Sequence, residues 1–359
     1  MTWSAQFFEF CRLEKLSFYA VSRFAKSGSF KDSAGTVKNM PRWNIRIPKI
    51  GYEITVAIHA LRLFLLALRV RPRIIFVESG VPDGTYLWLL RLSGAKVVPI
   101  LHCAFWPEGF RPTGMGARLR QMIYRAAWRG CFWRTLVVSP ACGRQLTAIA
   151  GNVPIFVFKP SFPASSFQSV AEPQDHGQLP FRVMYAGRIE ENKGVFDILS
   201  IAERLPRGKF EFTLCGDGPA LPALKREIAG RGLDDIVKTF GKLDRPELLA
   251  RYLDAHIVLV PTRSTFEEGF AMVVAEAILL LRPVVTSPVV PAAEILAAAI
   301  LMARTDDVQS YADQIANIQS DEAGYVNLVA HARRLRPFIL DDSTSLLAAL
   351  RAVWRDLPA

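Results

Sequence analysis

The stretch FRVMYAGRIEENKGVFDILSIAERL, residues 181–205, decides the fold of this chain. Its opening apolar run ends at a glycine and predicts a buried β-strand, whereas VFDILSIAERL has the apolar spacing of an amphipathic helix. Short apolar strands that alternate with helices predict an α/β fold, in which a doubly wound parallel sheet carries helices on both faces. In that fold, ligands bind where strand carboxyl ends meet helix amino ends. The alternation continues with strands predicted at 210–218, 236–243, 256–262 and 283–288 and helices at 221–232, 246–255, 270–281 and 292–300.

The first half shows the same alternation less completely. What is missing is a clean first strand with a glycine-rich turn, and the chain instead opens with a predicted helix at 3–16. We therefore expect a Rossmann-like domain that lacks its first strand. The predicted strands are 71–79, 95–102 and 135–140, with further candidates at 15–24 and 35–43, and the predicted helices are 85–94, 118–130 and a segment from 142.

A length of 359 residues predicts two domains. Residues 161–180 are rich in Pro, Ser and Gln without periodicity, which is typical of a linker. The predicted organisation is a first domain at 1–165, a linker at 166–180, a second domain at 181–340 and a C-terminal helix within 341–359.

Positive charge is concentrated in the first half, where residues 1–180 carry 23 of the 44 lysines and arginines but 9 of the 33 acidic residues. This imbalance predicts an anionic partner. Residues 115–134, MGARLRQMIYRAAWRGCFWR, predict a basic, aromatic, amphipathic helix typical of membrane surfaces. No nucleic-acid motif accompanies it, and solvated surface charge is the alternative. The apolar stretch 54–70 is short for a membrane span and contains arginines, so it predicts an amphipathic core helix.

The five cysteines are odd in number and form no CxxC pair, so they indicate neither a disulfide framework nor a zinc site. Reduced thiols in the cytosol are the expected state. The N-terminus lacks the basic start, apolar core and cleavage site of a signal peptide.

Two strand-end loops of the second half could hold phosphate. In AGRIEENKG the cations Arg188 and Lys193 suit a diphosphate, although a solvated loop with chance cations is the alternative. In CGDGPALPALK, Gly216 and Gly218 would open a helix and present amide groups to a phosphate or sugar. A nicotinamide-dinucleotide fingerprint needs a third glycine where Leu221 stands, and a tight structural turn explains the glycines equally well.

Glu276 stands in the otherwise apolar run TFEEGFAMVVAEAILLLRPVV, residues 265–285. A buried carboxylate without a partner is costly, so it requires an arginine or the hydroxyl groups of a ligand. Glu268 precedes it by eight positions, and on a continuous helix both would face one ligand. In the first half, His102 ends a predicted strand, where it is either structural or part of a site that faces the other domain.

Taken in order, these segments resemble the retaining glycosyltransferases of family 4, whose GT-B fold places two Rossmann-like domains across a cleft. The resemblance runs from about residue 50 to the C-terminus. Its most specific part is EEGFAMVVAEA, residues 267–277, which fits the E-x7-E pattern of that family. The other matching parts are His102, VVSPACGRQL, AGRIEENKG, LCGDGP, FGKL and RPVVTSPVVPAAEIL.

The resemblance implies a role for each matching residue. Glu276 would bind the ribose hydroxyls of a nucleotide sugar, and Glu268 would contact the donor sugar near the reacting carbon. Arg188 and Lys193 would stabilise the leaving diphosphate, and His102 would approach the donor sugar. The other implied donor-binding residues are Gly187, Gly216, Gly218, Gly269, Phe270, Ala271 and Met272, together with Lys242 and Leu243 near the base.

The resemblance also implies a UDP- or GDP-hexose co-substrate, retention of configuration, and no cofactor or metal, since no DxD triplet is present. The first domain would bind the acceptor, and the C-terminal helix would pack back against it. With the basic first half, the expected acceptor is a lipid-linked glycan at an anionic membrane surface, in exopolysaccharide or lipopolysaccharide synthesis. The expected location is cytoplasmic, peripheral on the inner face of the plasma membrane.

Three departures from the family stand out. Ala271 replaces a commoner glycine, and KPSFP at 159–163 replaces the usual asparagine–glycine strand ending. The missing first strand also removes a glycine-rich loop, so either the start is assigned too late, which we favour, or the site is incomplete. Two rival functions therefore remain: a GT-B-shaped protein that binds nucleotide sugar or glycan without turnover, and a nicotinamide-dependent enzyme built on LCGDGP.

Overall fold

The computed structural model describes residues 3–22, 28–30, 35–41, 51–79, 87–167, 170–173 and 175–358. The chain forms two compact units. The first comprises Met1–Phe105, Pro112–Ser161 and Asp342–Ala359, and the second comprises Trp106–Arg111 and Phe162–Asp341. The C-terminal residues therefore belong to the first unit, and the second unit includes the whole range 166–180 that was predicted as a linker.

The second unit is built on a six-stranded parallel sheet, five strands of which the alternation predicts. The sixth strand, at 300–302, was not predicted and begins where the predicted helix at 292–300 ends. Strand order is β10-β9-β8-β11-β12-β13, so the chain winds outward in both directions from β8 and β11. The neighbouring carboxyl ends of β8 and β11 thus form the switch point at which doubly wound sheets bind ligands. The strands are β8 (Phe181–Ala186), β9 (Phe210–Cys215), β10 (Val237–Gly241), β11 (Ile257–Val260), β12 (Val284–Thr286) and β13 (Ile300–Met302).

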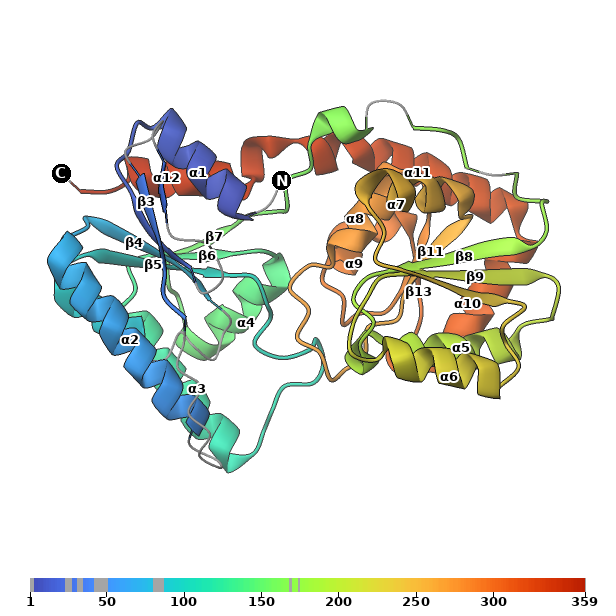
Figure 1. Ribbon diagram of the computed structural model, residues 1–359, viewed down its shortest axis with the longest axis horizontal. Coiled ribbons are helices and arrows are strands. Elements are labelled where there is room, and N and C mark those ends of the chain that lie inside the picture. The colour runs from blue at the N-terminus through green and yellow to red at the C-terminus, as the bar shows by residue number, and fades with distance from the viewer. Residues whose placement is uncertain are drawn as a thin grey trace. The chain divides into compact units, whose positions relative to one another are not determined.

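Helices cover both faces of this sheet: Figure 1 shows α5 and α6 on one face and α7 and α8 on the other. The inner strands β11 and β12 are wholly buried, as a two-sided sheet requires, whereas the edge strands β10 and β13 are partly exposed. The helices are α5 (Val195–Arg204), α6 (Leu221–Gly230), α7 (Arg245–Asp254), α8 (Met272–Leu279), α9 (Ala292–Ile295), α10 (Val308–Ser320) and α11 (Glu322–Leu340), with short 3-10 helices η4 (Ala164–Phe167), η5 (Glu191–Lys193) and η6 (Ala297–Ala299).

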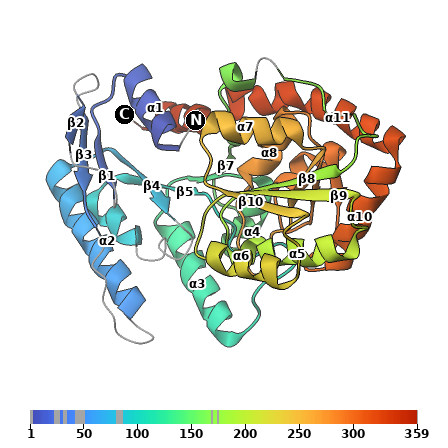
Figure 2. The same ribbon diagram turned by 45° about the vertical axis from the view of Figure 1, so that its right-hand side comes forward.

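The first unit contains a four-stranded parallel sheet of order β4-β5-β6-β7. Within the described residues β4 is its outermost strand, and the preceding chain forms α1 and a separate small sheet of order β1-β3-β2 (Figure 2). The strands are β1 (Tyr19–Ser22), β2 (Gly28–Phe30), β3 (Gly35–Asn39), β4 (Ile74–Ser79), β5 (Lys96–Leu101), β6 (Thr135–Val137) and β7 (Ile155–Val157). The helices are α1 (Trp3–Leu13), α2 (Gly51–Val70), α3 (Met115–Gly130), α4 (Pro140–Ala150) and α12 (Leu346–Arg355), with 3-10 helices η3 (Leu87–Ser93) and η7 (Asp342–Thr344).

The C-terminal helix α12 packs against α1 at the start of the chain. Arg351 of α12 pairs with Glu14 at 2.5 Å, and the rings of Phe10 and Trp354 meet edge to face. Helices α1 and α12, which are far apart in the sequence, therefore pack together in the first unit.

The structure corrects one helix prediction and shows which faces of two further predicted helices are buried. The segment predicted as an α-helix at 85–94 is, over 87–93, the tighter 3-10 helix η3. The predicted core helix α2 buries Val56 and Ala60 but leaves Leu61 and Leu65 exposed, so only one of its apolar faces reaches the core. In α3 the aromatic residues point inward, since Tyr124 and Trp128 are buried against the unit. Among the described helices, none is both long and apolar enough to cross a membrane.

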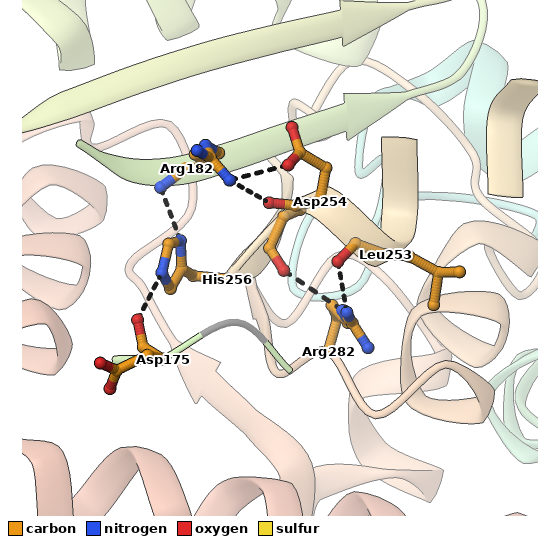
Figure 3. A network of polar contacts seen from close by, with 7 residues as sticks. Asp175, Arg182, Leu253, Asp254, His256 and Arg282 are labelled. Carbon is orange, nitrogen blue, oxygen red and sulfur yellow. Dashed lines mark hydrogen bonds and ion pairs between the residues drawn. The ribbon is translucent and has the colours of Figure 1, made fainter. Parts of the chain in front are cut away.

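The described part of the predicted linker is held against the second unit. Arg282 is fully buried, and it donates to the carbonyl oxygens of Leu253, Ala255, Leu280 and, from the linker, Ala171. His256 is also fully buried, and its Nε2 lies 3.1 Å from the carbonyl oxygen of Asp175 (Figure 3). A buried guanidinium requires acceptors for its N–H groups, and the linker supplies one of them.

Candidate functional site

Lys193 and Glu268 meet at the switch point of the second unit's sheet. Lys193 follows β8, Glu268 follows β11, and Lys193 Nζ lies 2.5 Å from Glu268 Oε2. Both side chains are largely buried, with 17% and 13% of their surface exposed. The ammonium group also lies 3.8 Å from the ring centroid of Phe266, a cation–π distance. A cation and a carboxylate, 75 residues apart in sequence, are thus held together where a ligand of this fold would bind.

Glycine is required here because the loops after β8, β9 and β11 touch through their backbones. Gly194 has φ +73°, and a Cβ there would lie 2.0 Å from the carbonyl oxygen of Pro261. A Cβ on Gly216 would lie 1.7 Å from the carbonyl oxygen of Gly187, and one on Gly218 would lie 2.4 Å from that of Ile189. Any side chain at these positions would push the loops apart and displace Lys193.

The amide groups of Gly216 and Gly218 already have protein acceptors. Gly216 N–H donates to the carbonyl oxygen of Gly241 at 2.8 Å, and Gly218 N–H donates to Asp217 Oδ1 at 2.8 Å. Helix α6 begins at Leu221, as predicted, and the two glycines lie in the turn that precedes it. Close backbone packing favours the structural-turn interpretation of both glycines.

Arg188 does not take part in the ion pair between Lys193 and Glu268. Its side chain is 71% exposed and pairs with Glu190, a residue that the sequence reasoning left out. Gly187, just before it, donates its N–H to the carbonyl oxygen of Cys215 at 3.0 Å. Each of the two cations predicted to hold a diphosphate therefore has its own carboxylate partner in this structure.

The loop that carries Glu268 is held by bonds on both sides. Arg263 N–H donates to the carbonyl oxygen of Asn192 at 3.0 Å, and Ser264 bonds Asp306 through its backbone N–H, at 3.1 Å, and through its hydroxyl group. Asp306 is a positioning residue for this loop that the sequence did not reveal, because it lies 42 residues further along the chain.

Glu268 and Glu276 do not lie on one continuous helix, so the predicted helical return over eight residues is wrong. Helix α8 begins at Met272, and Ala271 before it has φ +69° and ψ 84°, which interrupts the helical path. Phe270 and Ala271 are buried at this junction, whereas Met272 is exposed. Gly269 is buried between Glu268 and Phe270.

Glu276 has two protein partners on α7. Arg245 Nη1 lies 2.7 Å from Glu276 Oε1, and the hydroxyl group of Tyr252 lies 3.4 Å from Oε2. Of the two kinds of partner predicted for this carboxylate, the structure contains the arginine. Burial, and secondarily the charge of Glu276, raises the pKa of Tyr252 well above its usual value, so this phenol stays protonated and donates.

Lys242 and Leu243 follow the end of β10. Lys242 is exposed, and Gly241 before it turns the chain with φ +66°. Leu243 lines a surface hollow of about 420 Å³ beside α7, together with Glu247, Ala250, Arg251 and Asp254.

In the first unit, His102 follows β5 and lies beside the end of β4. Its Nε2 is 3.3 Å from Glu78 Oε1, and its ring centroid lies 4.5 Å from that of Trp3 and 5.8 Å from that of Phe158. Glu78 could have been found from sequence, because it ends the neighbouring predicted strand just as His102 follows the next one.

The segment that contains Lys193, Glu268 and Glu276 has known relatives. Residues 171–335 match the family model described as glycosyl transferases group 1. This segment, just under half of the chain, is therefore similar to the group 1 glycosyl transferases. Among curated proteins, the chain is 36% identical over 109 residues to an alpha-D-kanosaminyltransferase of Streptomyces kanamyceticus, covering 30% of this chain and 28% of that protein. It is 31% identical over 162 residues to the amylovoran biosynthesis glycosyltransferase AmsK of Erwinia amylovora, covering 43% of this chain and 40% of AmsK. The matches thus span less than half of these curated relatives.

Solved glycosyltransferase structures share the fold over most of the chain. HepE of Anabaena, in complex with UDP, aligns with a TM-score of 0.66 at 19% identity, covering 89% of this chain and 86% of HepE. Sucrose-phosphate synthase of Thermosynechococcus elongatus aligns with a TM-score of 0.74 at 15% identity, covering 99% and 94%. The predicted α/β architecture with parallel sheets, of the GT-B type, is confirmed.

The two carboxylates of this segment have different partners: Glu268 pairs with Lys193 at the switch point, whereas Glu276 pairs with Arg245 of α7. Among the described residues, no group of three or more His, Cys, Asp or Glu side chains is placed to hold a metal ion. Metal independence stays a prediction.

Proposed function

We propose that the chain is a retaining glycosyltransferase that moves a hexose from a UDP- or GDP-sugar to a glycan acceptor. The observation that carries this proposal is the 2.5 Å contact between Lys193 and Glu268 at the sheet's switch point, inside the segment that matches the group 1 glycosyl transferase model. HepE has been solved in complex with UDP and with UDP-glucose, which supports a nucleotide-sugar donor here.

In this proposal Lys193 stabilises the negative charge that grows on the leaving diphosphate. Without donor, Glu268 balances the lysine, and with donor the phosphate takes over the ammonium group while the carboxylate turns to the sugar. The backbone of Gly269, Phe270 and Ala271 borders the sugar, and Glu276 binds the ribose. Arg188, whose side chain is exposed, can swing from Glu190 to the diphosphate without disturbing the core.

The acceptor we propose is a lipid-linked glycan, in exopolysaccharide or lipopolysaccharide synthesis, on the inner face of the plasma membrane. AmsK is a glycosyltransferase of amylovoran biosynthesis, which supports the pathway class. Helix α3 supports the membrane surface, because it exposes an apolar stripe, with Met115 at 88% and Met122 at 67% exposure. The helix contains arginines but no acidic residue, as binding to an anionic surface requires.

The donor proposal is tested by thermal shift with UDP, GDP, ADP and NAD, followed by donor hydrolysis. We expect UDP or GDP to raise the unfolding temperature, and Glu268→Ala to lower donor turnover by about 10²- to 10³-fold, the usual cost of losing a preorganised electrostatic contact. The matched control is Glu267→Ala, which removes the exposed neighbouring carboxylate and should leave turnover unchanged.

The rival functions give different outcomes in the same experiment. A binding protein without turnover would be stabilised by a nucleoside diphosphate but would hydrolyse no donor in either form. A nicotinamide-dependent enzyme would respond to NAD and ignore the three nucleoside diphosphates. Indifference to UDP, GDP and ADP alike would contradict the proposal.

A further inference from the structure

The carboxylate of Glu276 has acceptor capacity that its protein partners leave unused. A carboxylate offers about four lone-pair positions on its two oxygens. Arg245 occupies one position on Oε1, at 2.7 Å, and Tyr252 occupies one on Oε2, at 3.4 Å. The Glu276 side chain is 20% exposed, so the carboxylate is partly open to solvent and can receive a ligand.

We propose that Arg245 is a positioning residue for nucleotide recognition: it fixes the Glu276 carboxylate so that the remaining acceptor position on each oxygen takes one ribose hydroxyl. This inference rests on the proposed function, because it names the residue that prepares Glu276 for its nucleotide. Two vicinal hydroxyls, 2′ and 3′, match two free positions on adjacent carboxylate oxygens. Tyr252 holds the second oxygen in the same arrangement.

Helix α7 is built to present both donors to this one carboxylate. Asp244 and Glu247 form a capping box, with bonds of 2.9 and 3.1 Å between each side chain and the other's backbone N–H. The box fixes the first turn, in which Arg245 is the first helical residue. Tyr252 follows seven residues later, which on a helix is two turns along the same face.

The guanidinium group of Arg245 is held from a second side as well. Its central carbon lies 5.4 Å from the ring centroid of Phe167, a residue fully buried in the second unit. A planar guanidinium over a ring has a defined orientation, which a lysine ammonium group would lack. The arginine is therefore restrained by the helix start, the ring and the carboxylate together.

The alternative is a purely structural role, in which the Arg245–Glu276 ion pair only holds α7 against α8. Loss of that pair would lower the stability of the fold, and any loss of affinity would be the same for nucleotides with and without ribose hydroxyls. A positioning role instead predicts loss of the contribution that the hydroxyls make. The ratio of affinities for UDP and 2′,3′-dideoxy-UDP separates the two roles.

The experiment is calorimetric titration of the full chain with these two ligands, or with GDP and 2′,3′-dideoxy-GDP if the thermal-shift panel selects guanine. For the wild type we expect the hydroxyl-bearing ligand to bind about tenfold or more tightly, since bonds to a charged group exceed ordinary ones. In Arg245→Met this ratio should fall toward one, while the affinity for the dideoxy ligand changes less than about twofold. Glu276→Gln should lower the ratio too, and the double variant should lower it no further than Glu276→Gln alone, because the two residues act as one unit.

The matched control is Arg251→Met on the same helix, whose guanidinium stacks 3.8 Å over the ring of Phe240 instead. It should keep the wild-type ratio. Arg245→Lys, which keeps the charge without the fork, should give an intermediate ratio and serves if the methionine variant does not fold.

The outcomes distinguish this inference from the proposed function. If the wild type binds the nucleoside diphosphate and prefers the ribose hydroxyls, but Arg245→Met and Arg245→Lys keep that preference, the positioning role alone is overturned. A wild type that binds both ligands equally also overturns it and leaves nucleotide binding intact. A wild type that binds neither overturns the proposed function and, with it, the inference.

Discussion

At the scale of single residues, Ala271 shows the cost of a side chain where the backbone turns left-handed. It has φ +69° at the start of α8, a conformation that disfavours any residue with a Cβ. We expect Ala271→Gly to raise the free energy of unfolding by about 0.5–1 kcal/mol, since relief of about 1–2 kcal/mol of strain outweighs the added freedom of the unfolded chain. Urea unfolding measures this. Ala250→Gly, at an exposed position within α7, is the control and should destabilise by about 1 kcal/mol; equal losses in both variants would contradict the strain argument.

The candidate site could be predicted from sequence only as far as local chemistry reaches. A carboxylate in an apolar run requires a partner, so the sequence predicts an arginine or the hydroxyl groups of a ligand beside Glu276. The sequence does not identify Arg245, because this partner lies on another helix, 31 residues earlier. Lys193 and Glu268 were each singled out, but their direct contact depends on the order of β8 and β11 in the sheet.

At the scale of elements, the alternation of strands and helices predicted the parallel sheet well, because short continuous apolar runs that end at glycine or proline alternate with longer amphipathic segments. Helix α3 shows the limit of this reasoning. Its sequence predicted a basic, aromatic, amphipathic helix but not which side meets the core, and the structure buries Tyr124 and Trp128. A helix with two apolar stripes does not reveal from its own sequence which stripe meets the core. The exposed stripe is Met115, Leu119, Met122 and Ile123.

This exposed stripe of α3 carries the membrane prediction. We expect the protein to co-sediment with phosphatidylglycerol-containing vesicles and not with phosphatidylcholine vesicles, and to be released by salt. Met122→Glu should weaken vesicle binding about tenfold or more, because it replaces buried apolar contact by repulsion. Val326→Glu on α11 makes the same kind of change at an exposed apolar position of the second unit and should leave binding as it is. Binding of Met122→Glu equal to that of Val326→Glu would rule out this helix as the membrane contact.

At the scale of the whole molecule, stability should depend on pH through His256. The ring is fully buried, with the N–H of Arg182 donating to Nδ1 at 2.9 Å and Nε2 lying 3.1 Å from the carbonyl oxygen of Asp175. Nδ1 is therefore an acceptor, and a proton there would oppose the Arg182 donor. Burial lowers the pKa of His256 below its usual 6.5. The folded chain keeps the ring neutral, whereas the unfolded chain takes up a proton as the pH falls through 6.5, so each protonation event favours unfolding.

The free energy of unfolding should consequently be highest above pH 6.5 and fall as the pH drops toward the lowered pKa of His256, by up to about 1.4 kcal/mol per pH unit. Urea unfolding at pH 7.5 and pH 5.5 measures the loss. His256→Gln keeps a hydrogen-bonding side chain that does not titrate, so its loss between the two pH values should be smaller than that of the wild type. Asp197, whose pKa burial raises, acts in the opposite direction and is present in both proteins, so the difference between them isolates the histidine. An equal fall in the free energy of unfolding in both proteins would show that protonation of His256 does not cause the loss of stability at acid pH.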